Sequence, residues 1–321
     1  VLGLIPGSNP SLSQQPVVVL AHLDHLGYGW PDVRAGNEGK LHPGADDNAS
    51  GVSVMLESAR TLKRTARPQR PILFVATSGE EWGLKGAQRL VSGGSSIPLV
   101  EGMAAISIDA VGRYEEGKFL VLGAGSATEW VHIVRGVGFT TGIKAISVNE
   151  DPGGSDHVIF HQLGIPGIQL TTGAHKDFHR PGDTAEKING EGLALVYQWL
   201  IETLGYLGER VEPLTSTLDE GSDQTIRRPA STGSRKVYLG TVPDFADSGP
   251  GVRFDSVMPE SPAEAAGLQK GDRLISLNGK VVADLRAYSQ LLKNLTPEVE
   301  IVLEIVRLGE KKTVSVIPTK K

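Results

Sequence analysis

Short apolar segments alternate with helical periodicity along the first two thirds of the chain. Segments made almost wholly of Val, Ile, Leu and Ala are typical of strands buried on both faces of a sheet. Such apolar segments lie at residues 17–21, 71–76 and 104–108, and residues 165–170 are a further strand candidate. Apolar residues spaced three and four apart predict helices at about 50–67, 85–90 and 190–207. This alternation predicts an α/β fold, a mostly parallel mixed sheet flanked by helices.

The pattern changes after residue 208. Residues 209–235 contain many Ser, Thr and Pro without apolar periodicity, which predicts a solvated linker. Short strands and one helix are expected in 236–321, a small β-rich domain. We therefore expect two domains, 1–208 and 236–321. A single domain with one long surface loop is disfavoured, because structureless loops of that length are uncommon within compact domains.

Composition narrows the chemistry. The 321 residues fit two domains, and a net charge of −5 disfavours nucleic acid as a partner. No run reaches the roughly 18 apolar residues of a transmembrane segment, and none is expected. The absence of cysteine excludes disulfides and thiolate catalysis, so any metal must be bound by His, Asp and Glu. The first seven residues already have the pattern of a strand and turn, which predicts that the natural chain starts further upstream.

Acidic residues and histidines gather where the expected strands end. They are His22, Asp24 and His25 after the first strand, Asp46 and Asp47 in the next loop, Glu80 and Glu81 after the second strand, Asp109 after the third, and His179 much later. The carboxyl ends of parallel strands meet at one edge of a sheet, where α/β proteins build their sites. We therefore expect these side chains to converge.

Each group also has a simpler explanation. Asp46 and Asp47 fit a turn or helix cap, and Glu80 and Glu81 fit a first helical turn. Asp109 has no such simple structural explanation. A carboxylate that directly follows an apolar strand is costly to bury unless it is paired or metal-bound. Crowded carboxylates repel one another, and a bound divalent cation neutralises them.

Hydrolysis at a two-metal site requires specific components. One carboxylate bridges two ions about 3.5–4 Å apart, and further N or O ligands lie about 2.0–2.2 Å from each zinc. A separate carboxylate must take the proton from the attacking water. The gathered residues contain these components.

Five motifs in the same order resemble those of the co-catalytic zinc aminopeptidases, a family that includes secreted bacterial leucyl aminopeptidases and is related to the glutamate carboxypeptidases. They are Ala-His-Leu-Asp-His-Leu-Gly at 21–27, Gly-Ala-Asp-Asp-Asn-Ala-Ser-Gly at 44–51, Ser-Gly-Glu-Glu-Trp-Gly at 78–83, Ile-Asp-Ala-Val-Gly-Arg at 108–113 and His-Arg-Pro-Gly-Asp-Thr at 179–184. The resemblance covers about residues 1–207 and implies a zinc exopeptidase-like fold.

The resemblance also implies two Zn²⁺ per chain and assigns their ligands. Asp46 would bridge both ions, His22 and Asp109 would complete one half, and Glu81 and His179 the other half.

Four other residues receive roles from the same resemblance. Glu80 would be the general base, and Asp24 would hold the His22 ring in place. Asp156 would lie near the free amine of the substrate, with a structural helix cap as the alternative. His25 departs from the family pattern, and we expect it to have a structural role.

The last domain resembles a bacterial PDZ domain over about 236–319. The resemblance rests on Ser-Pro-Ala-Glu-Ala-Ala-Gly-Leu at 261–268 and Gly-Asp-Arg-Leu-Ile at 271–275. PDZ domains bind a peptide C-terminus as an added strand, with a loop of backbone N–H groups at its carboxylate. The implied loop residues are Tyr238, Leu239, Gly240 and Thr241, and the helix at 285–293 would form the other wall. Alternatively, the protein itself occupies the groove.

Together these patterns predict a metallo-aminopeptidase that hydrolyses N-terminal residues from peptides, with a PDZ domain for substrate recruitment or gating. A secreted or periplasmic location follows from the resemblance. The alternatives are a related carboxypeptidase, for which only Arg113 and Arg180 could hold a substrate carboxylate, a one-zinc glutaminyl cyclase, and a PDZ scaffold with an inactive peptidase domain. Two complete ligand sets disfavour the cyclase and the inactive scaffold.

Overall fold

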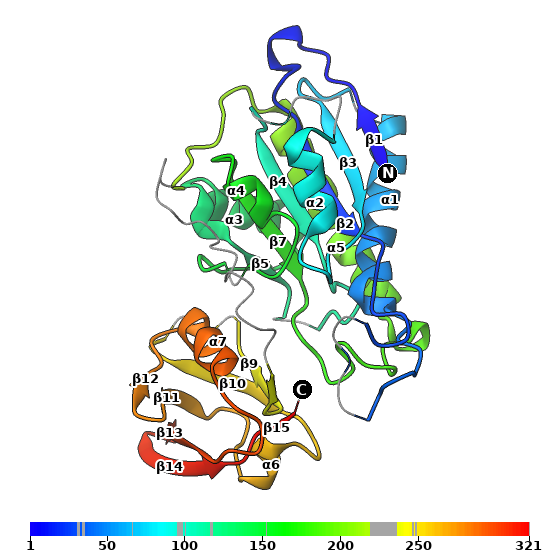
Figure 1. The fold of residues 1–321 in the computed structure, drawn as a ribbon. Coiled ribbons are helices and arrows are strands. Elements are labelled where there is room, and N and C mark those ends of the chain that lie inside the picture. Colours follow the sequence, from blue (N-terminus) through cyan, green and yellow to red (C-terminus); the bar gives the residue numbers. More distant parts are fainter. Residues whose placement is uncertain are drawn as a thin grey trace. The chain divides into compact units, whose positions relative to one another are not determined.

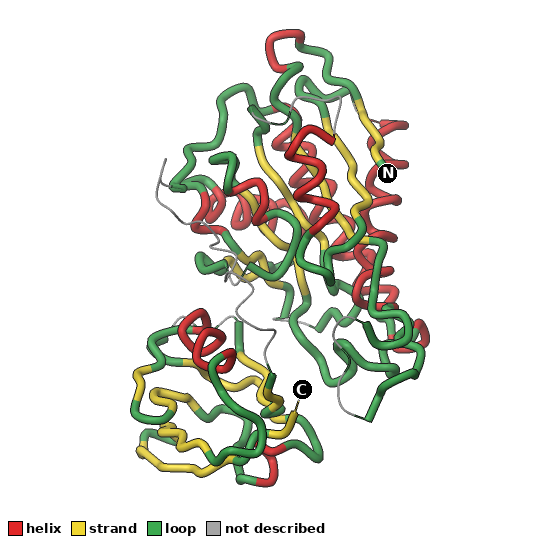
Figure 2. The backbone as a smooth tube through the Cα atoms, in the orientation of Figure 1, coloured by secondary structure: helices red, strands yellow, loops and turns green. Residues whose placement is uncertain are grey.

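The computed structural model describes all residues except 31, 32, 34, 35, 66, 95–98, 100, 116, 117, 152, 219–235, 246, 248 and 321. Contacts within the chain divide it into two compact units (Figures 1 and 2). The first contains most residues up to 218, and the second contains all described residues from 236 onward.

A seven-stranded sheet runs through the first unit in the order β1-β3-β2-β4-β7-β5-β6. The strands are β1 (Leu2–Ile5), β2 (Val17–His22), β3 (Ile72–Thr77), β4 (Ala104–Ile108), β5 (Leu120–Leu122), β6 (Ile146–Ser147) and β7 (Gly167–Thr171). The central strands β3, β2, β4 and β7 are parallel, whereas β1 is antiparallel to β3 and β5 to β7. The expected mostly parallel mixed sheet is confirmed.

Helices cover both faces of this sheet. They are α1 (Gly51–Thr65), α2 (Lys85–Arg89), α3 (Trp130–Thr141), α4 (Val158–His161) and α5 (Gly190–Glu209). Alternate residues of β2 point to opposite faces, so that Val17 and Val19 pack in one cluster and Val18 and Leu20 in another. The first cluster includes residues of α1, α3 and α5, and the second lies on the side of α4.

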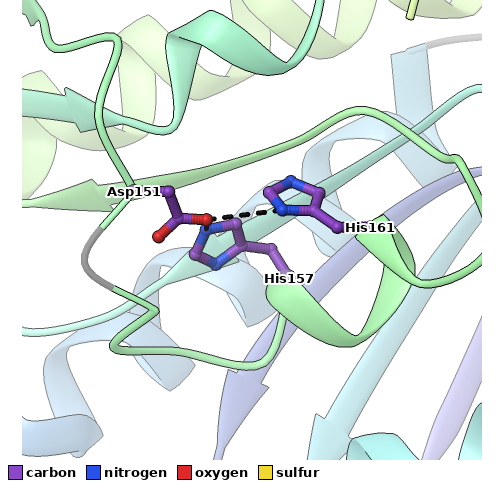
Figure 3. A group of neighbouring side chains, drawn as sticks. All are labelled: Asp151, His157 and His161. Atoms are coloured by element: carbon purple, nitrogen blue, oxygen red, sulfur yellow. Dashed lines mark hydrogen bonds and ion pairs between the residues drawn. The ribbon is translucent and has the colours of Figure 1, made fainter. Parts of the chain in front are cut away.

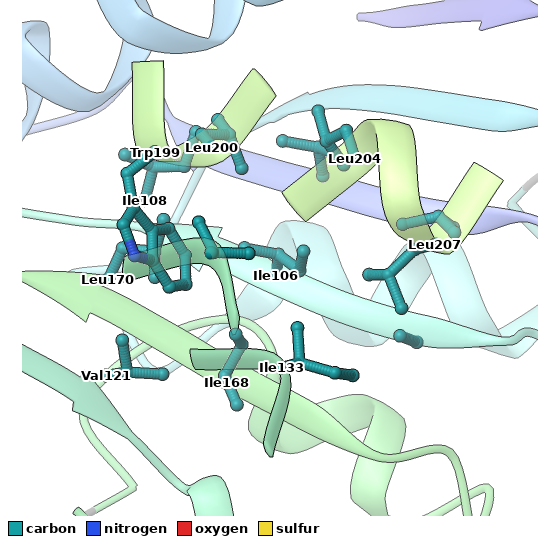
Figure 4. Packing of buried hydrophobic residues seen from close by; sticks show 14 of the residues in the cluster. Ile106, Ile108, Val121, Ile133, Ile168, Leu170, Trp199, Leu200, Leu204 and Leu207 are labelled. Carbon is teal, nitrogen blue, oxygen red and sulfur yellow. The ribbon is translucent and has the colours of Figure 1, made fainter. Parts of the chain in front are cut away.

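The longest helix shows how the larger core is built. Trp199, Leu200, Leu204 and Leu207 of α5 are fully buried and lie over the sheet (Figure 4). The helix begins at Asn189, whose side chain accepts a hydrogen bond from Gly192 N, a typical N-cap. None of the helices in the described part of the chain is long and apolar enough to cross a membrane.

The first residues of the expected linker are instead attached to the first unit. Leu214 is 6% exposed and belongs to the main core cluster. Thr215 donates its backbone N–H to the Glu129 carboxylate, at 2.9 Å, and Ser216 forms an antiparallel bridge with Ala127. A polar sequence without periodicity can still be fixed by one buried side chain and a carboxylate, which explains the difference. Residues 219–235 lie outside the described part of the chain.

The second unit has its own sheet and core. Its strands are β8 (Val237–Tyr238), β9 (Thr241–Pro243), β10 (Val252–Val257), β11 (Arg273–Leu277), β12 (Lys280–Val281), β13 (Ile301–Arg307), β14 (Glu310–Val316) and β15 (Thr319–Lys320), and its helices are α6 (Pro262–Ala265) and α7 (Leu285–Lys293). The main sheet has the order β14-β13-β11-β10-β9. Phe254, Leu274 and Ile305 are fully buried in a separate apolar cluster.

Candidate metal centre and active site

The strand ends bring the expected residues together. His22 is the last residue of β2 and lies in register with Thr77, the last residue of β3. Asp109 directly follows β4, and Glu80 and Glu81 follow β3. Because β3, β2 and β4 are adjacent and parallel, their carboxyl ends form one edge of the sheet.

The two nitrogens of the His22 ring have different partners: one is hydrogen-bonded to the backbone, and the other faces the carboxylates of the site. Nδ1 lies 2.9 Å from the backbone carbonyl oxygen of Asp24, which can only accept, so Nδ1 carries the proton. Nε2 lies 3.2 Å from Asp47 Oδ1 and 3.5 Å from Asp109 Oδ1. Burial lowers the pKa of His22, but the two carboxylates more than offset this and raise it well above the usual value. The same negative field attracts a metal cation.

Asp47 is the carboxylate that joins the two histidines. Its Oδ1 faces His22, while Oδ2 lies 3.1 Å from Nε2 of His179. Burial raises the pKa of Asp47, but hydrogen bonding to His179 and His22 holds it well below its usual range. A buried, ionised carboxylate with one oxygen toward each histidine has the geometry of a bridging ligand.

Our assignment of that position to Asp46 is therefore corrected. Asp46 Oδ1 accepts hydrogen bonds from Gly112 N and Ser50 Oγ. The Asp183 carboxylate accepts the backbone N–H groups of both Asp46 and Asp47 at 2.9–3.1 Å. This fixes the loop so that the two adjacent side chains diverge and only that of Asp47 lies between the histidines.

Glu81 completes the second half of the site. Its Oε2 lies 3.2 Å from His179 Nε2, and its Oε1 lies 2.9 Å from His25 Nδ1. His25 thus contacts the oxygen of Glu81 that is not paired with His179, and its structural role stays a prediction. Phe178 stacks on the His179 ring at a centroid distance of 4.2 Å and fixes its orientation.

Glu80 lies beside this cluster with a different environment. Its backbone N–H donates to Asp24 Oδ1 at 3.3 Å. Burial, and then the charges of Asp109 and Glu81, raise the pKa of Glu80 well above its usual value, although His22 opposes them. A carboxyl group with a raised pKa is suited to exchange a proton near neutral pH. The Asp24 carboxylate thus accepts the Glu80 N–H and also lies 3.8 Å from His22 Nδ1, while the backbone oxygen of Asp24 makes the closer contact with that ring, at 2.9 Å.

Asp156 is the expected residue that the structure places least favourably for substrate. It is 1% exposed, and its Oδ2 accepts a hydrogen bond from the Thr77 hydroxyl. Burial raises its pKa to about 6. Such a buried carboxyl has almost no surface for a substrate amine, and its contacts are those of a residue that positions the end of β3.

Sequence reasoning assigned no role to Asp183. It is fully buried, and the Arg113 guanidinium lies 3.2 Å from its Oδ1 and 3.6 Å from Asp177 Oδ2. Asp183 stands in the last of the five motifs, which was the available signal. Arg113, which we considered as a cation for a substrate carboxylate, is thus already paired with two carboxylates.

The residues present fit zinc. The two donor sets are His22, Asp47 and Asp109, and His179, Asp47 and Glu81. Their N···O distances of 3.1–3.5 Å match the separation of about 3.4 Å between neighbouring ligands of a tetrahedral zinc. Histidine nitrogens and carboxylate oxygens are common ligands of catalytic zinc.

The residues expected to form a peptide groove in the second unit lie around β9 and α7. β9 is the last strand of its sheet in the described residues, so its outer edge is open to an added strand. Gly240, just before β9, has a left-handed φ of 88°, and a Cβ there would clash with the side chain of Ser261. Thr241 Oγ1 lies 2.7 Å from the hydroxyl of Tyr288 on α7, so that a hydrogen bond joins the edge strand to the helix.

An α/β sheet with two histidine–carboxylate sets near the carboxyl ends of its strands fits a metal-dependent hydrolase. The family model of peptidase family M28 matches residues 1–204, and the model of the PDZ domain matches residues 253–307. The chain belongs to peptidase family M28 and carries a PDZ domain.

Particular relatives agree with this. Aminopeptidase YwaD of Bacillus subtilis is 33% identical over 160 residues, which are 47% of this chain and 35% of that protein. The structure of BSAP, described as a zinc aminopeptidase from Bacillus subtilis, is similar with a TM-score of 0.55 and 25% identity, over 68% of this chain and 53% of that one. The chain thus spans about a third to a half of these relatives. A Porphyromonas gingivalis glutaminyl cyclase, 21% identical with a TM-score of 0.54 over 64% of this chain and 76% of that one, shares the fold.

Proposed function

We propose that this chain is a two-zinc aminopeptidase that removes the N-terminal residue from peptides. The observation that carries the proposal is the position of Asp47, with one oxygen toward His22 and the other toward His179. Asp109 and Glu81 then complete one donor set each. Bound zinc ions would supply Lewis-acid activation of the carbonyl and of a water molecule.

The protein's own residues would divide the remaining work. Glu80 is close to both donor sets but is not needed in either, so its carboxylate can take a proton from the attacking water and deliver it to the leaving amine. Asp24 fixes the backbone of Glu80. His25 and the Asp24 carbonyl hold Glu81 and His22 in the orientations that the donor sets require.

An aminopeptidase is favoured over a carboxypeptidase by the state of Arg113. A carboxypeptidase needs a cation to bind the terminal carboxylate of its substrate, but Arg113 is committed to Asp177 and Asp183 and is only 17% exposed. The similarity to YwaD and BSAP, which are described as aminopeptidases, supports the same choice.

We further propose that the PDZ domain binds a peptide C-terminus along the open edge of β9. The glycine at 240 and the nearby α7 helix support this, because a peptide carboxylate needs an accessible loop and a groove wall. The bound peptide is either a substrate or a segment of the enzyme itself. These two alternatives predict different effects of the domain on the hydrolysis of long substrates.

The activity test compares matched substrates. We expect zinc-loaded protein to hydrolyse aminoacyl arylamides. It should be inactive on the same compounds with an acetylated amine, and on N-acetylated peptides with a free C-terminus, which are carboxypeptidase substrates. Elemental analysis should show that the wild type binds two zinc ions more than Asp47→Ala does. Hydrolysis of the acetylated and free compounds at equal rates, or no hydrolysis of either by zinc-loaded protein, would contradict the proposal.

A further inference from the structure

A second cluster of metal-binding side chains lies in the first unit, outside the candidate active site. Asp151, in the loop after β6, faces His157, just before α4, and His161, the last residue of α4 (Figure 3). His157 Nε2 lies 3.1 Å from Asp151 Oδ2, and His161 Nδ1 lies 3.5 Å from the same oxygen. The other oxygen, Oδ1, accepts the backbone N–H of Gly153 at 2.7 Å.

The His161 ring cannot donate a proton to Asp151 while it is neutral. Its Nε2 lies 3.2 Å from the backbone oxygen of Gly167, which only accepts, so Nε2 carries the proton. Nδ1 is then a lone pair and faces the carboxylate oxygen of Asp151, another acceptor.

His157 cannot relieve this conflict. Its side chain is completely buried, and Nδ1 has no hydrogen-bond partner among the described residues. A proton on Nε2 would satisfy the contact of His157 with Asp151 Oδ2, but would leave the lone pair of His161 still facing that oxygen. Buried polar atoms normally have partners, so the lone pair of His161 Nδ1 facing a carboxylate oxygen, with a second imidazole nitrogen at the same oxygen, indicates a cation between them.

We propose that Asp151, His157 and His161 bind a divalent transition-metal cation, zinc above all, at a site separate from the one around Asp47. The contact distances of 3.1 and 3.5 Å match the separation of about 3.4 Å between ligands of a tetrahedral zinc. All three ligand atoms lie within 4.8 Å of one another. Two imidazoles and a carboxylate suit zinc and its neighbours better than magnesium or calcium.

The surroundings of His161 supply the outer contact that is typical of a metal-bound histidine. Gly167 fixes the proton of His161 on the far nitrogen, as His22 is fixed by the carbonyl of Asp24 in the candidate active site. Asp151 is 17% and His161 15% exposed, so that water can provide a fourth ligand and a cation can enter.

A cation here would have a consequence for the active site. The segment that ends at His157 includes Asp156, which bonds to Thr77, and Ser155, whose hydroxyl bonds to Asp109. The cation would therefore fix the segment that holds the end of β3 and the Asp109 ligand. Its role would be structural, and it would touch no substrate.

The test counts zinc in the full chain after removal of metal with a chelator, reloading with zinc and gel filtration. Asp151→Asn should bind one zinc fewer than the wild type. An asparagine keeps the acceptor for Gly153, and its amide N–H groups can donate to the two rings, so the variant should fold. His132→Gln is the matched control, since His132 is exposed on α3 and lies outside the cluster; it should bind as much zinc as the wild type.

Thermal unfolding gives a second, independent measurement of zinc binding. Zinc should raise the unfolding temperature of the wild type more than that of Asp151→Asn. Equal zinc counts in Asp151→Asn and the wild type would overturn the proposal. If Asp151→Asn does not fold, His161→Gln replaces it, and an equal zinc count in that variant would overturn the proposal in the same way. Because each result is a difference between variants, it does not depend on how many ions bind around Asp47 or on whether the protein is an aminopeptidase.

Discussion

Oδ2 of Asp47 lies 3.1 Å from Nε2 of His179, although the two residues come from loops at opposite ends of the first domain's sequence. The other oxygen of Asp47 faces His22, 3.2 Å away. One carboxylate therefore connects both donor sets. Its removal should affect both of them, whereas removal of any other donor should affect one.

Replacement of Asp47 and of its neighbour Asp46 should give opposite results. Asp47→Ala should lose both zinc ions and all measurable activity. Asp46→Ala should keep zinc, but should unfold more easily by about 1–3 kcal/mol, because the partners of its buried carboxylate lose their acceptor. Elemental analysis and thermal unfolding of both variants measure this. Retention of two ions by Asp47→Ala, together with metal loss in Asp46→Ala, would restore Asp46 as the bridge.

Glu80→Gln should keep the metal and lose turnover. The change removes the proton acceptor but neither donor set, and general-base groups contribute on the order of 10²–10⁴-fold to the rate. The values of kcat for an aminoacyl arylamide, with zinc counted in the same preparation, measure the effect. Glu81→Gln is the matched neighbour and should lose zinc at the His179 half. A fully metallated Glu80→Gln with normal kcat would remove Glu80 from the role of base.

The sequence allowed most of the first fold to be predicted, because its central strands are continuous apolar runs. Residues 17–21 and 104–108 are buried on both faces, and burial of that kind leaves an unambiguous pattern. Helix α3 was not predicted. It contains Gly136 and Gly138, which weaken a helical signal, and it is held by packing of Trp130 and its neighbours.

The residue types of the site were predictable, but one choice between neighbours was not. Asp46 and Asp47 are adjacent in one motif, and their orientation is set by Asp183, far away in sequence. The burial of Leu214 was likewise not predictable, because a single apolar residue in a polar segment produces no periodic pattern. The secreted or periplasmic location stays a prediction from the family resemblance.

Glu129 should stabilise the segment at 214–217 in a pH-dependent way. Its carboxylate accepts the backbone N–H and the hydroxyl of Thr215. Burial raises the pKa of Glu129, but the hydrogen bonds from Thr215 outweigh it and hold the pKa below the usual value. A lowered folded pKa means that the stabilisation is complete above the unfolded value of about 4.3 and is lost as pH falls through the folded value.

The matched variant is Glu129→Gln, which keeps the shape and loses the charge. At pH 7 we expect it to unfold about 2–4 °C below the wild type, for a loss on the order of 1 kcal/mol. The difference should shrink below about pH 4. A difference that is constant from pH 7 to pH 3 would show that the charge of Glu129 does not stabilise this segment.

Removal of residues 236–321 should leave a folded peptidase. All residues of the two donor sets and Glu80 lie in the first unit, whose core contains no residue of the second. The truncated protein should therefore hydrolyse small aminoacyl reporters at close to the full rate. A protein that does not fold would show that the second unit is required for the stability of the first.

Long peptides should reveal what the PDZ domain does. If the open edge of β9 recruits substrates, the truncated protein loses kcat/KM on a decapeptide but not on the reporter, because only the longer chain can add a strand and present a terminal carboxylate. If the domain instead limits access, truncation raises kcat/KM on the decapeptide alone. Amidation of the decapeptide C-terminus separates carboxylate recognition from chain length. If the domain recruits substrates, amidation should lower kcat/KM of the full chain and leave kcat/KM of the truncated protein unchanged. Equal changes on the reporter and on both decapeptides would exclude recruitment and gating alike.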